Sequence, residues 1–175
     1  MTNRKRISTP VIPLIQLYDT GTQTFTIAGE FHTWDSVAFK TSDFHYIEDD
    51  DRVFINVPSA GYYEITFECS FIKDDNIGVS SATSQVYKNG EAVTGAQAIG
   101  CSYETGQTKV SCACITLHFI IYLKAKDYIQ IKTTASANNM LSECETSRLV
   151  IKFIPTDGWN NNSGGNKNYR GRIER

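Results

Sequence analysis

The chain has 175 residues, of which 41% are hydrophobic and 11% aromatic, and its formal net charge at pH 7 is −2. A chain of this length fits one domain whose core needs neither a metal nor disulfides. The near-neutral charge argues against a general nucleic-acid binder, which is normally basic. No stretch approaches the roughly 20 consecutive apolar residues that a membrane helix needs.

Residues 1–20 are predicted to form an extended N-terminal arm. Residues 4–6 are basic, and Pro10 and Pro13 disfavour both a helix and a central strand. The apolar part of the arm is short and interrupted, unlike that of a secretory signal. We therefore expect the protein to be made and kept in a cytoplasm, or to be assembled there into something larger.

Short runs of β-branched and aromatic residues follow the arm, and such runs favour strands. The first predicted strands are residues 21–28, 33–39 and 52–57, and residues 47–52 are predicted to be an acidic turn. Pro58 and Gly61 then mark a tight bend.

The stretch GYYEITFECSFI, which begins at Gly61, has the clearest strand pattern. Its residues alternate with a period of two, which makes a helix implausible. The residues predicted to face the core are Tyr63, Ile65, Phe67, Cys69 and Phe71. Those predicted to face the opposite way are Tyr62, Glu64, Thr66, Glu68 and Ser70.

The stretch SQVYKNGEAVTG, from Ser84 to Gly95, predicts a β-hairpin. Both central residues of a type I′ turn need positive φ, which Asn and Gly tolerate best. Asn89 and Gly90 are therefore expected to form the turn.

Residues 109–123, KVSCACITLHFIIYL, are too long and too apolar for a strand with one solvated face. They are predicted to form a central strand that is covered on much of both sides. A turn at residues 124–127 leads to a strand at residues 128–135. A last strand spans residues 148–154 and ends at Pro155.

Together these elements predict an all-β fold of about eight to ten short strands, arranged as a two-sheet antiparallel jelly roll. The jelly-roll domain is predicted to span residues 21–155. From residue 156 onward Asn, Gly and Ser dominate the sequence. Residues 156–175 are therefore predicted to be a low-complexity tail, too poor in core-forming residues to order itself alone.

Four stretches in this order, VPSAGYYEITFECSF, SQVYKNGEAV, CITLHFIIYLKAKDYIQIKT and SRLVIKFI, resemble a known family. That family comprises the globular head of complement component 1q and the tumour necrosis factor superfamily. The resemblance covers roughly Trp34 to Ile154 and departs at one position, because Lys126 precedes Asp127 where the family usually has Gly. It implies a jelly roll that forms compact homotrimers and acts as a binding module rather than as an enzyme.

Heads of this type occur in secreted proteins, on bacterial spores, and on the fibres and capsids of viruses. Secreted versions need a signal peptide and often carry a collagen-like stalk, and the sequence has neither feature. We therefore expect a homotrimeric head on a virion surface, as capsid decoration or fibre knob, assembled in the host cytoplasm with other capsid or fibre proteins. Two alternatives stay open: a free soluble head that binds a receptor or glycan, and a coat protein that builds a shell itself.

The predicted trimer interface combines the outward face of strand 62–71 with the strand that follows Asp127. It consists of Tyr62, Glu64, Thr66, Glu68, Tyr128, Gln130 and Lys132. Glu64 and Glu68 would repel their symmetry mates unless they are paired, for instance with Lys132.

Particle attachment is predicted at the two ends, where apolar residues of the kind that fill interface pockets occur beside basic ones. The predicted attachment residues are Val11, Ile12, Leu14, Ile15, Trp159, Tyr169 and Ile173. Pro10 and Pro13 would hold the arm extended, which suits a segment that adds to a sheet edge. The alternative that the basic ends only solubilise the protein stays open. Genome binding is disfavoured, because so few charges bind nucleic acid weakly.

No catalytic motif and no cofactor fingerprint is recognisable in the sequence. His32, His45 and His118 lack the spacing of metal ligands, and a single His on a strand is more often structural. The five cysteines are interpreted as small apolar side chains in a reducing compartment.

One acidic run is a weak candidate for a calcium site. Asp49, Asp50 and Asp51 supply the clustered carboxylate oxygens that calcium prefers. Because consecutive residues on a loop splay their side chains, a solvated acidic turn is the preferred interpretation.

Overall fold

The structure is a computed structural model that describes residues 12–41, 44–49, 52–73, 78–104, 113–136, 140–142 and 147–155. Within these ranges every regular element is a strand, so the predicted all-β class is confirmed. The strands are β1 (Leu14–Tyr18), β2 (Thr24–Phe25), β3 (Glu30–Phe31), β4 (Ser36–Lys40), β5 (His45–Asp49), β6 (Arg52–Asn56), β7 (Gly61–Lys73), β8 (Gly78–Lys88), β9 (Glu91–Glu104), β10 (Ala113–Leu123), β11 (Tyr128–Ala135), β12 (Met140–Ser142) and β13 (Arg148–Ile154). The described residues contain no helix of the length and hydropathy that would span a membrane.

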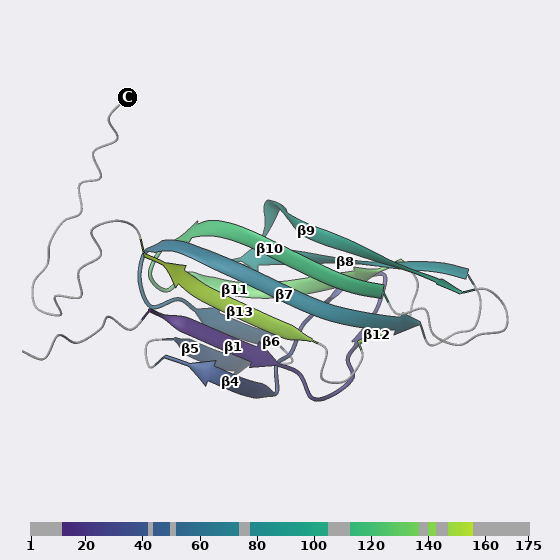
Figure 1. Ribbon diagram of the computed structural model, residues 1–175, viewed down its shortest axis with the longest axis horizontal. Coiled ribbons are helices and arrows are strands. Elements are labelled where there is room, and N and C mark those ends of the chain that lie inside the picture. The colour runs from purple at the N-terminus through teal and green to yellow at the C-terminus, as the bar shows by residue number, and fades with distance from the viewer. Residues whose placement is uncertain are drawn as a thin grey trace, which may run out of the picture.

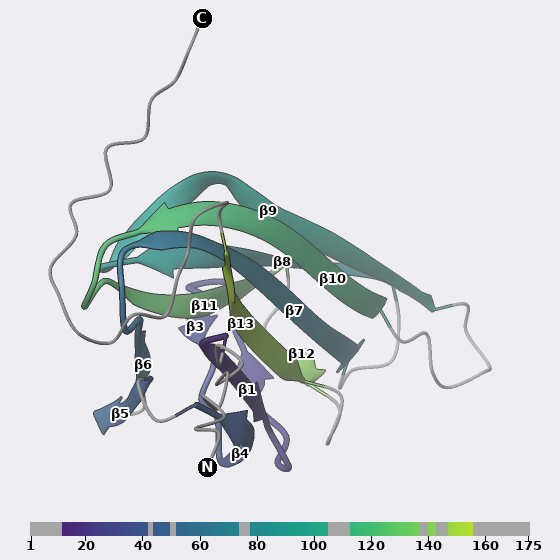
Figure 2. The same cartoon turned by 60° about the vertical axis from the view of Figure 1, so that its left-hand side comes forward.

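The strands form two antiparallel sheets (Figures 1 and 2). Sheet A has the order β4-β1-β13-β7-β10. In addition, β12 pairs with the C-terminal part of β7, and β2 pairs with β12. Sheet B has the order β5-β6-β11-β8-β9, and β3 pairs with β11 beyond β6. The first and last strands of the chain, β1 and β13, are neighbours in sheet A. This layout confirms the predicted two-sheet jelly roll.

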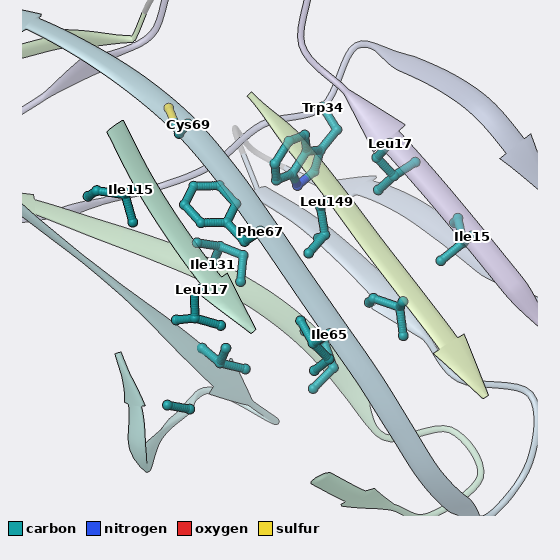
Figure 3. Close-up of a cluster of buried hydrophobic side chains, with 14 of the residues drawn as sticks. Ile15, Leu17, Trp34, Ile65, Phe67, Cys69, Ile115, Leu117, Ile131 and Leu149 are labelled. Carbon is teal, nitrogen blue, oxygen red and sulfur yellow. The ribbon is translucent and has the colours of Figure 1, made fainter. Parts of the chain in front are cut away.

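The core lies between the sheets, and β7 crosses its centre (Figure 3). All five residues of β7 that the alternation assigns to the core are buried, and Phe67 is 0% exposed. Ile115 and Leu117 join them from β10, and Ile129 and Ile131 from β11. The alternation of apolar and polar residues in β7 therefore corresponds to one buried face, as predicted.

The prediction that residues 109–123 form a central strand is wrong. Among the described strands β10 pairs only with β7, and its other edge lies beside β9 of the second sheet (Figure 2). One face of β10 enters the core, while Ile120 and Tyr122 on the other face are exposed. The run is apolar because both faces carry large side chains, although only one of them is covered.

The predicted N-terminal arm extends too far along the chain. β1 pairs with β13 on one side and with β4 on the other, and its Ile15 and Leu17 are fully buried. Pro13 lies just before this strand, so it removes no hydrogen bond from the ladder. The jelly roll therefore begins at β1 rather than at residue 21, and the tail at residues 156–175 lies outside the described residues.

Three other predicted elements need correction. Residues 47–52, predicted to be a turn, contribute to β5 and β6, which pair from His45↔Asn56 to Asp49↔Arg52. The predicted strand 21–28 shrinks to the two residues of β2, followed by a turn and the two residues of β3. Trp34, placed in the strand 33–39, precedes β4 and fills the core instead.

The predicted type I′ turn is confirmed, since φ is 52° at Asn89 and 83° at Gly90. Asn89 also binds the next turn, because its Nδ2 donates to Asp127 Oδ1 at 2.8 Å and its Oδ1 accepts from the Tyr128 amide at 2.9 Å. Burial alone would raise the pKa of Asp127, but the hydrogen bonds from Asn89 and the Lys124 amide lower it below its usual value. Two turns distant in sequence thus stabilise each other.

Lys126 has a φ of 72°, in the left-handed region that a glycine enters without steric cost. The resembled family usually has Gly at this position. Lysine at this position therefore places a side chain in a backbone conformation that favours glycine.

Both ends of the described chain lie at the same end of sheet A. Leu14 pairs with Lys152, and the Phe153 amide donates to the Pro13 carbonyl at 2.9 Å. Because β1 and β13 are antiparallel, the chain enters at Pro13 and leaves at Pro155 side by side.

Candidate binding surface

The side of sheet A that is turned away from the core carries several exposed apolar side chains. Residues directly opposite each other on paired strands point to the same face, so the register of β10, β7 and β13 defines this surface. We call it the outer face, and it comprises Tyr62, Glu64, Thr66, Glu68, Thr116, His118, Ile120, Tyr122, Arg148, Val150 and Lys152.

One end of the outer face is apolar. Tyr62 and Tyr122 are paired across β7 and β10, and their rings meet edge to face with centroids 5.4 Å apart. Both are 49% exposed, and Ile120 beside them is 54% exposed. We call these three residues the aromatic patch.

The middle of the outer face carries a charged cluster centred on Glu64. His118 Nε2 lies 2.7 Å from Glu64 Oε1, and Lys152 Nζ lies 3.8 Å from Glu64 Oε2. The hydrogen bond from His118 and the charge of Lys152 lower the pKa of Glu64 below its usual value. Glu64 is thus an ionised acceptor with partners on both neighbouring strands.

The far end of the outer face is also paired. Arg148 Nη2 donates to Glu68 Oε2 at 2.6 Å, across β13 and β7. The two acidic residues predicted to need partners therefore have them within the same chain, on strands adjacent to their own. The prediction that Lys132 pairs with them is wrong, because Lys132 lies on β11 in sheet B.

The structure does not bring the predicted interface residues together. Tyr62, Glu64, Thr66 and Glu68 lie on the outer face of sheet A, as predicted. Tyr128, Gln130 and Lys132 belong to β11 in sheet B, on the other layer of the sandwich. Gln130 is moreover only 4% exposed, and Lys132 Nζ lies over the Phe31 ring, 5.5 Å from its centroid.

Several residues of the outer face were not predicted, namely Ile120, Tyr122, His118, Arg148 and Lys152. The alternation of β10 and β13 contains the signal that each set shares one face. Which strand lies next to β7 is set by pairing between distant segments, and no local pattern encodes it.

The predicted attachment residues fall into three groups. Ile12, which precedes β1, is exposed, and Leu14, the first residue of β1, is half-buried. Ile15 is fully buried and cannot serve as an anchor, because its side chain lies in the core between the two sheets. Those outside the described residues are Val11, Trp159, Tyr169 and Ile173.

The structure describes only part of the candidate calcium site. Asp49 ends β5, while Asp50 and Asp51 lie outside the described residues. His32 is buried and His118 lies on the outer face. The described part of the chain contains no group of three or more His, Cys, Asp or Glu side chains that could hold a metal ion.

The described cysteines are free thiols: Cys69 is buried, while Cys101 and Cys114 are exposed. Cys69 Sγ lies 2.9 Å from Ser147 Oγ, inside the core. Cys112 and Cys144 lie outside the described residues.

Comparison with solved structures identifies the fold. Eiger TNF from S. frugiperda superposes with a TM-score of 0.57 at 10% identity, over 82% of this chain and 93% of that one. Murine APRIL, in a crystal structure at pH 5.0, superposes with a TM-score of 0.54 at 10% identity, over 82% of this chain and all of the other. The chain therefore has the jelly-roll fold of tumour necrosis factor-like proteins. No protein-family model matches the sequence, and no curated protein matches it.

Proposed function

We propose that the protein is a non-enzymatic binding head that assembles into a homotrimer through the outer face of sheet A. The observation that carries this proposal is the aromatic patch, where three large side chains lie exposed on a regular sheet. Exposed clusters of this kind, rimmed by polar residues, mark interaction sites. The charged residues around the patch are already paired within the chain, so covering them leaves no isolated charge.

A closed ring of identical subunits needs two different surfaces, because each subunit presents one to each neighbour. The aromatic patch supplies one surface. The adjacent sandwich edge, where β9 and β10 lie side by side, supplies the other and carries Ile99, which is 62% exposed (Figure 2). The edge of one subunit is thus suited to pack on the outer face of the next.

The test is the mass of the purified protein at micromolar concentration, by sedimentation or native mass spectrometry. A trimer is expected, and a particle of dozens of chains would favour a shell-forming coat protein instead. Ile120→Lys should reduce the trimer to monomers. Ile27→Lys is the matched control, because Ile27 is 60% exposed in the turn before β3, outside both surfaces. A clean monomer of the unaltered chain would overturn the trimeric assignment.

We further propose that the trimer is mounted on a virus or phage particle, as a capsid decoration or fibre knob, through its two ends. This proposal is supported by the side-by-side position of Pro13 and Pro155, which lets both terminal segments reach one partner surface. Deleting residues 1–11, residues 157–175, or both should leave the trimer and its melting temperature unchanged while incorporation into particles falls. Normal incorporation of the truncated trimers would assign attachment to the jelly-roll body.

A further inference from the structure

One short segment closes the sandwich by crossing from one sheet to the other. Residues 24–34, here called the latch, begin with β2, which pairs with β12 in sheet A, and continue through β3, which pairs with β11 in sheet B. Each of these two pairings spans only two residues. Beyond them, the Thr26 carbonyl accepts from the Ala135 amide, and the His32 amide donates to the Ile131 carbonyl.

The latch is held mainly by three large side chains that it inserts into the core: Phe25, His32 and Trp34, each at most 1% exposed. The His32 ring lies 4.6 Å from the Phe25 ring and 4.8 Å from the Phe67 ring, and it stacks on Trp34 at 5.5 Å. A histidine therefore occupies the centre of an aromatic cluster beneath β7.

The surroundings of His32 suit only its neutral form. Its Nε2 lies 2.7 Å from Thr133 Oγ1, which in turn lies 2.7 Å from Ser84 Oγ, while its Nδ1 has no hydrogen-bond partner among the described residues. The groups that contact it from β2, β7, β11 and Trp34 are uncharged. Burial lowers the pKa of His32 to about 3.

Among the residues that the structure describes, no charged side chain is hydrogen-bonded or ion-paired to the His32 ring. Cys69 follows Phe67 on the core face of β7, and its thiol contacts Ser147. Asp19 is engaged by Gln23, which also binds the backbone of Thr33 on the far side of the latch. The closed latch therefore offers a protonated His32 neither water nor, among the described residues, a carboxylate partner to stabilise its charge.

We propose that the latch is an acid-operated device: protonation of His32 releases residues 24–34 from the core while β7, β10 and β13 stay paired. The proposal does not depend on the trimer. Release is local because β7 pairs with β10 over eleven residues and with β13 over seven, whereas the latch has two at each end. Segments with few ladder bonds open at lower free energy than the central strands.

The direction of the pH dependence follows from linkage. In the open latch His32 meets water and titrates near its ordinary pKa of about 6.5, whereas in the closed latch its pKa is depressed. Closure is therefore fully stabilised above pH 6.5 and loses stability as the pH falls toward 3. Below pH 6.5 the opening equilibrium should rise by about tenfold per pH unit, because opening takes up one proton.

The test is hydrogen exchange of the full chain between pH 7 and pH 5, expressed as protection factors so that intrinsic chemistry cancels. Carboxylates of ordinary pKa stay mostly ionised in this range. The chain has three histidines, so a His45→Gln/His118→Gln variant leaves His32 as the only one and does not disturb the latch. In this variant the protection of amides in residues 24–34 should fall about tenfold from pH 6 to pH 5, while that of β13 amides stays constant.

Two outcomes would overturn the proposal: latch amides whose protection is independent of pH, or a fall shared equally by β13, which would mean global unfolding. Fluorescence gives a second readout, because in a Trp159→Phe background Trp34 is the only tryptophan. Its emission should shift to the red over the same pH range. His32→Gln, which keeps a donor for Thr133 but cannot titrate, should abolish both pH dependences if it folds.

Discussion

The two faces of β7 differ in burial and in the polarity of their side chains. On the inner face the residues are buried, and all but Cys69 are aromatic or aliphatic; Phe67 packs against both Trp34 and His32. On the outer face the residues are partly exposed, and Glu64 and Glu68 are paired to neighbouring strands. The inner face therefore determines whether the chain folds, whereas the outer face is available for the binding role that we propose.

The strongest test of this division is Phe67→Ala. It should lower the free energy of unfolding by about 3–5 kcal/mol, because it empties a ring-sized volume between the sheets. Urea denaturation measures the loss, which is large against a typical total of roughly 5–15 kcal/mol. Thr66→Ala, one residue away on the outer face, is the matched control and should cost less than about 0.5–1 kcal/mol. Equal effects of the two substitutions would mean that the faces are not distinguished as the structure has them.

A smaller effect is expected at the start of β7, where Gly61 lets the Phe153 ring close against the backbone. A Cβ at this position would lie 2.4 Å from Phe153 Cε2, and Phe153 is itself only 5% exposed. Gly61→Ala should therefore cost about 1–3 kcal/mol through overpacking. Gly21→Ala is the control, since its Cβ would meet only Asp19 Oδ1 at an ordinary 3.5 Å. A melting temperature unchanged by Gly61→Ala would show that this end of β7 is loosely packed.

The inner face and the hairpin are the parts that the sequence predicts best. Both are local: the alternation around Phe67 needs only the pleat of one strand, and Asn89-Gly90 needs only the φ preference of two residues. The assignment of Lys132 to the outer face fails because it requires knowing which strands are neighbours. The alternation of β11 is real, but its pairing with β8 places it in the other sheet.

Two other features escape prediction for different reasons. Ile15 and Leu17 alternate as a strand should, yet Pro10 and Pro13 suggest an extended arm, and only the pairing with β13 decides the matter. The burial of His32 could not be predicted, because the local sequence around a single histidine does not distinguish an exposed site from an aromatic cluster. Its role depends on Phe67 and Thr133, which are distant in sequence.

Lys126 combines an exposed side chain with a constrained backbone conformation. Its side chain faces solvent, but its backbone has a positive φ in the turn that carries the chain from sheet A to sheet B. Lys126→Gly should raise the stability by about 0.5–1 kcal/mol, since relief of left-handed strain outweighs the added freedom of the unfolded chain. Ala125→Gly is the control: Ala125 lacks a positive φ, so glycine there should destabilise. A loss of stability in Lys126→Gly would contradict the strain.

The smallest expected effect belongs to the pair formed by Glu68 and Arg148 on the outer face. Its side chains are 39% and 48% exposed in the single chain. Exposed pairs of this kind contribute about 0.2–1 kcal/mol, and salt weakens them. A double-mutant cycle with Glu68→Gln and Arg148→Gln, measured by denaturation of the Ile120→Lys variant that we expect to be monomeric, should therefore give a coupling energy in this range.

The same cycle in the assembled protein tests whether the far end of the outer face joins the interface. Close charge pairs at a covered interface couple by about 1.5–7 kcal/mol, because water no longer screens them. A coupling that rises into this range on assembly would place Glu68 inside the contact, together with the aromatic patch. If the coupling stays small and salt-sensitive in the trimer, the contact ends between Glu64 and Glu68. The far end of the outer face would then remain open to another partner.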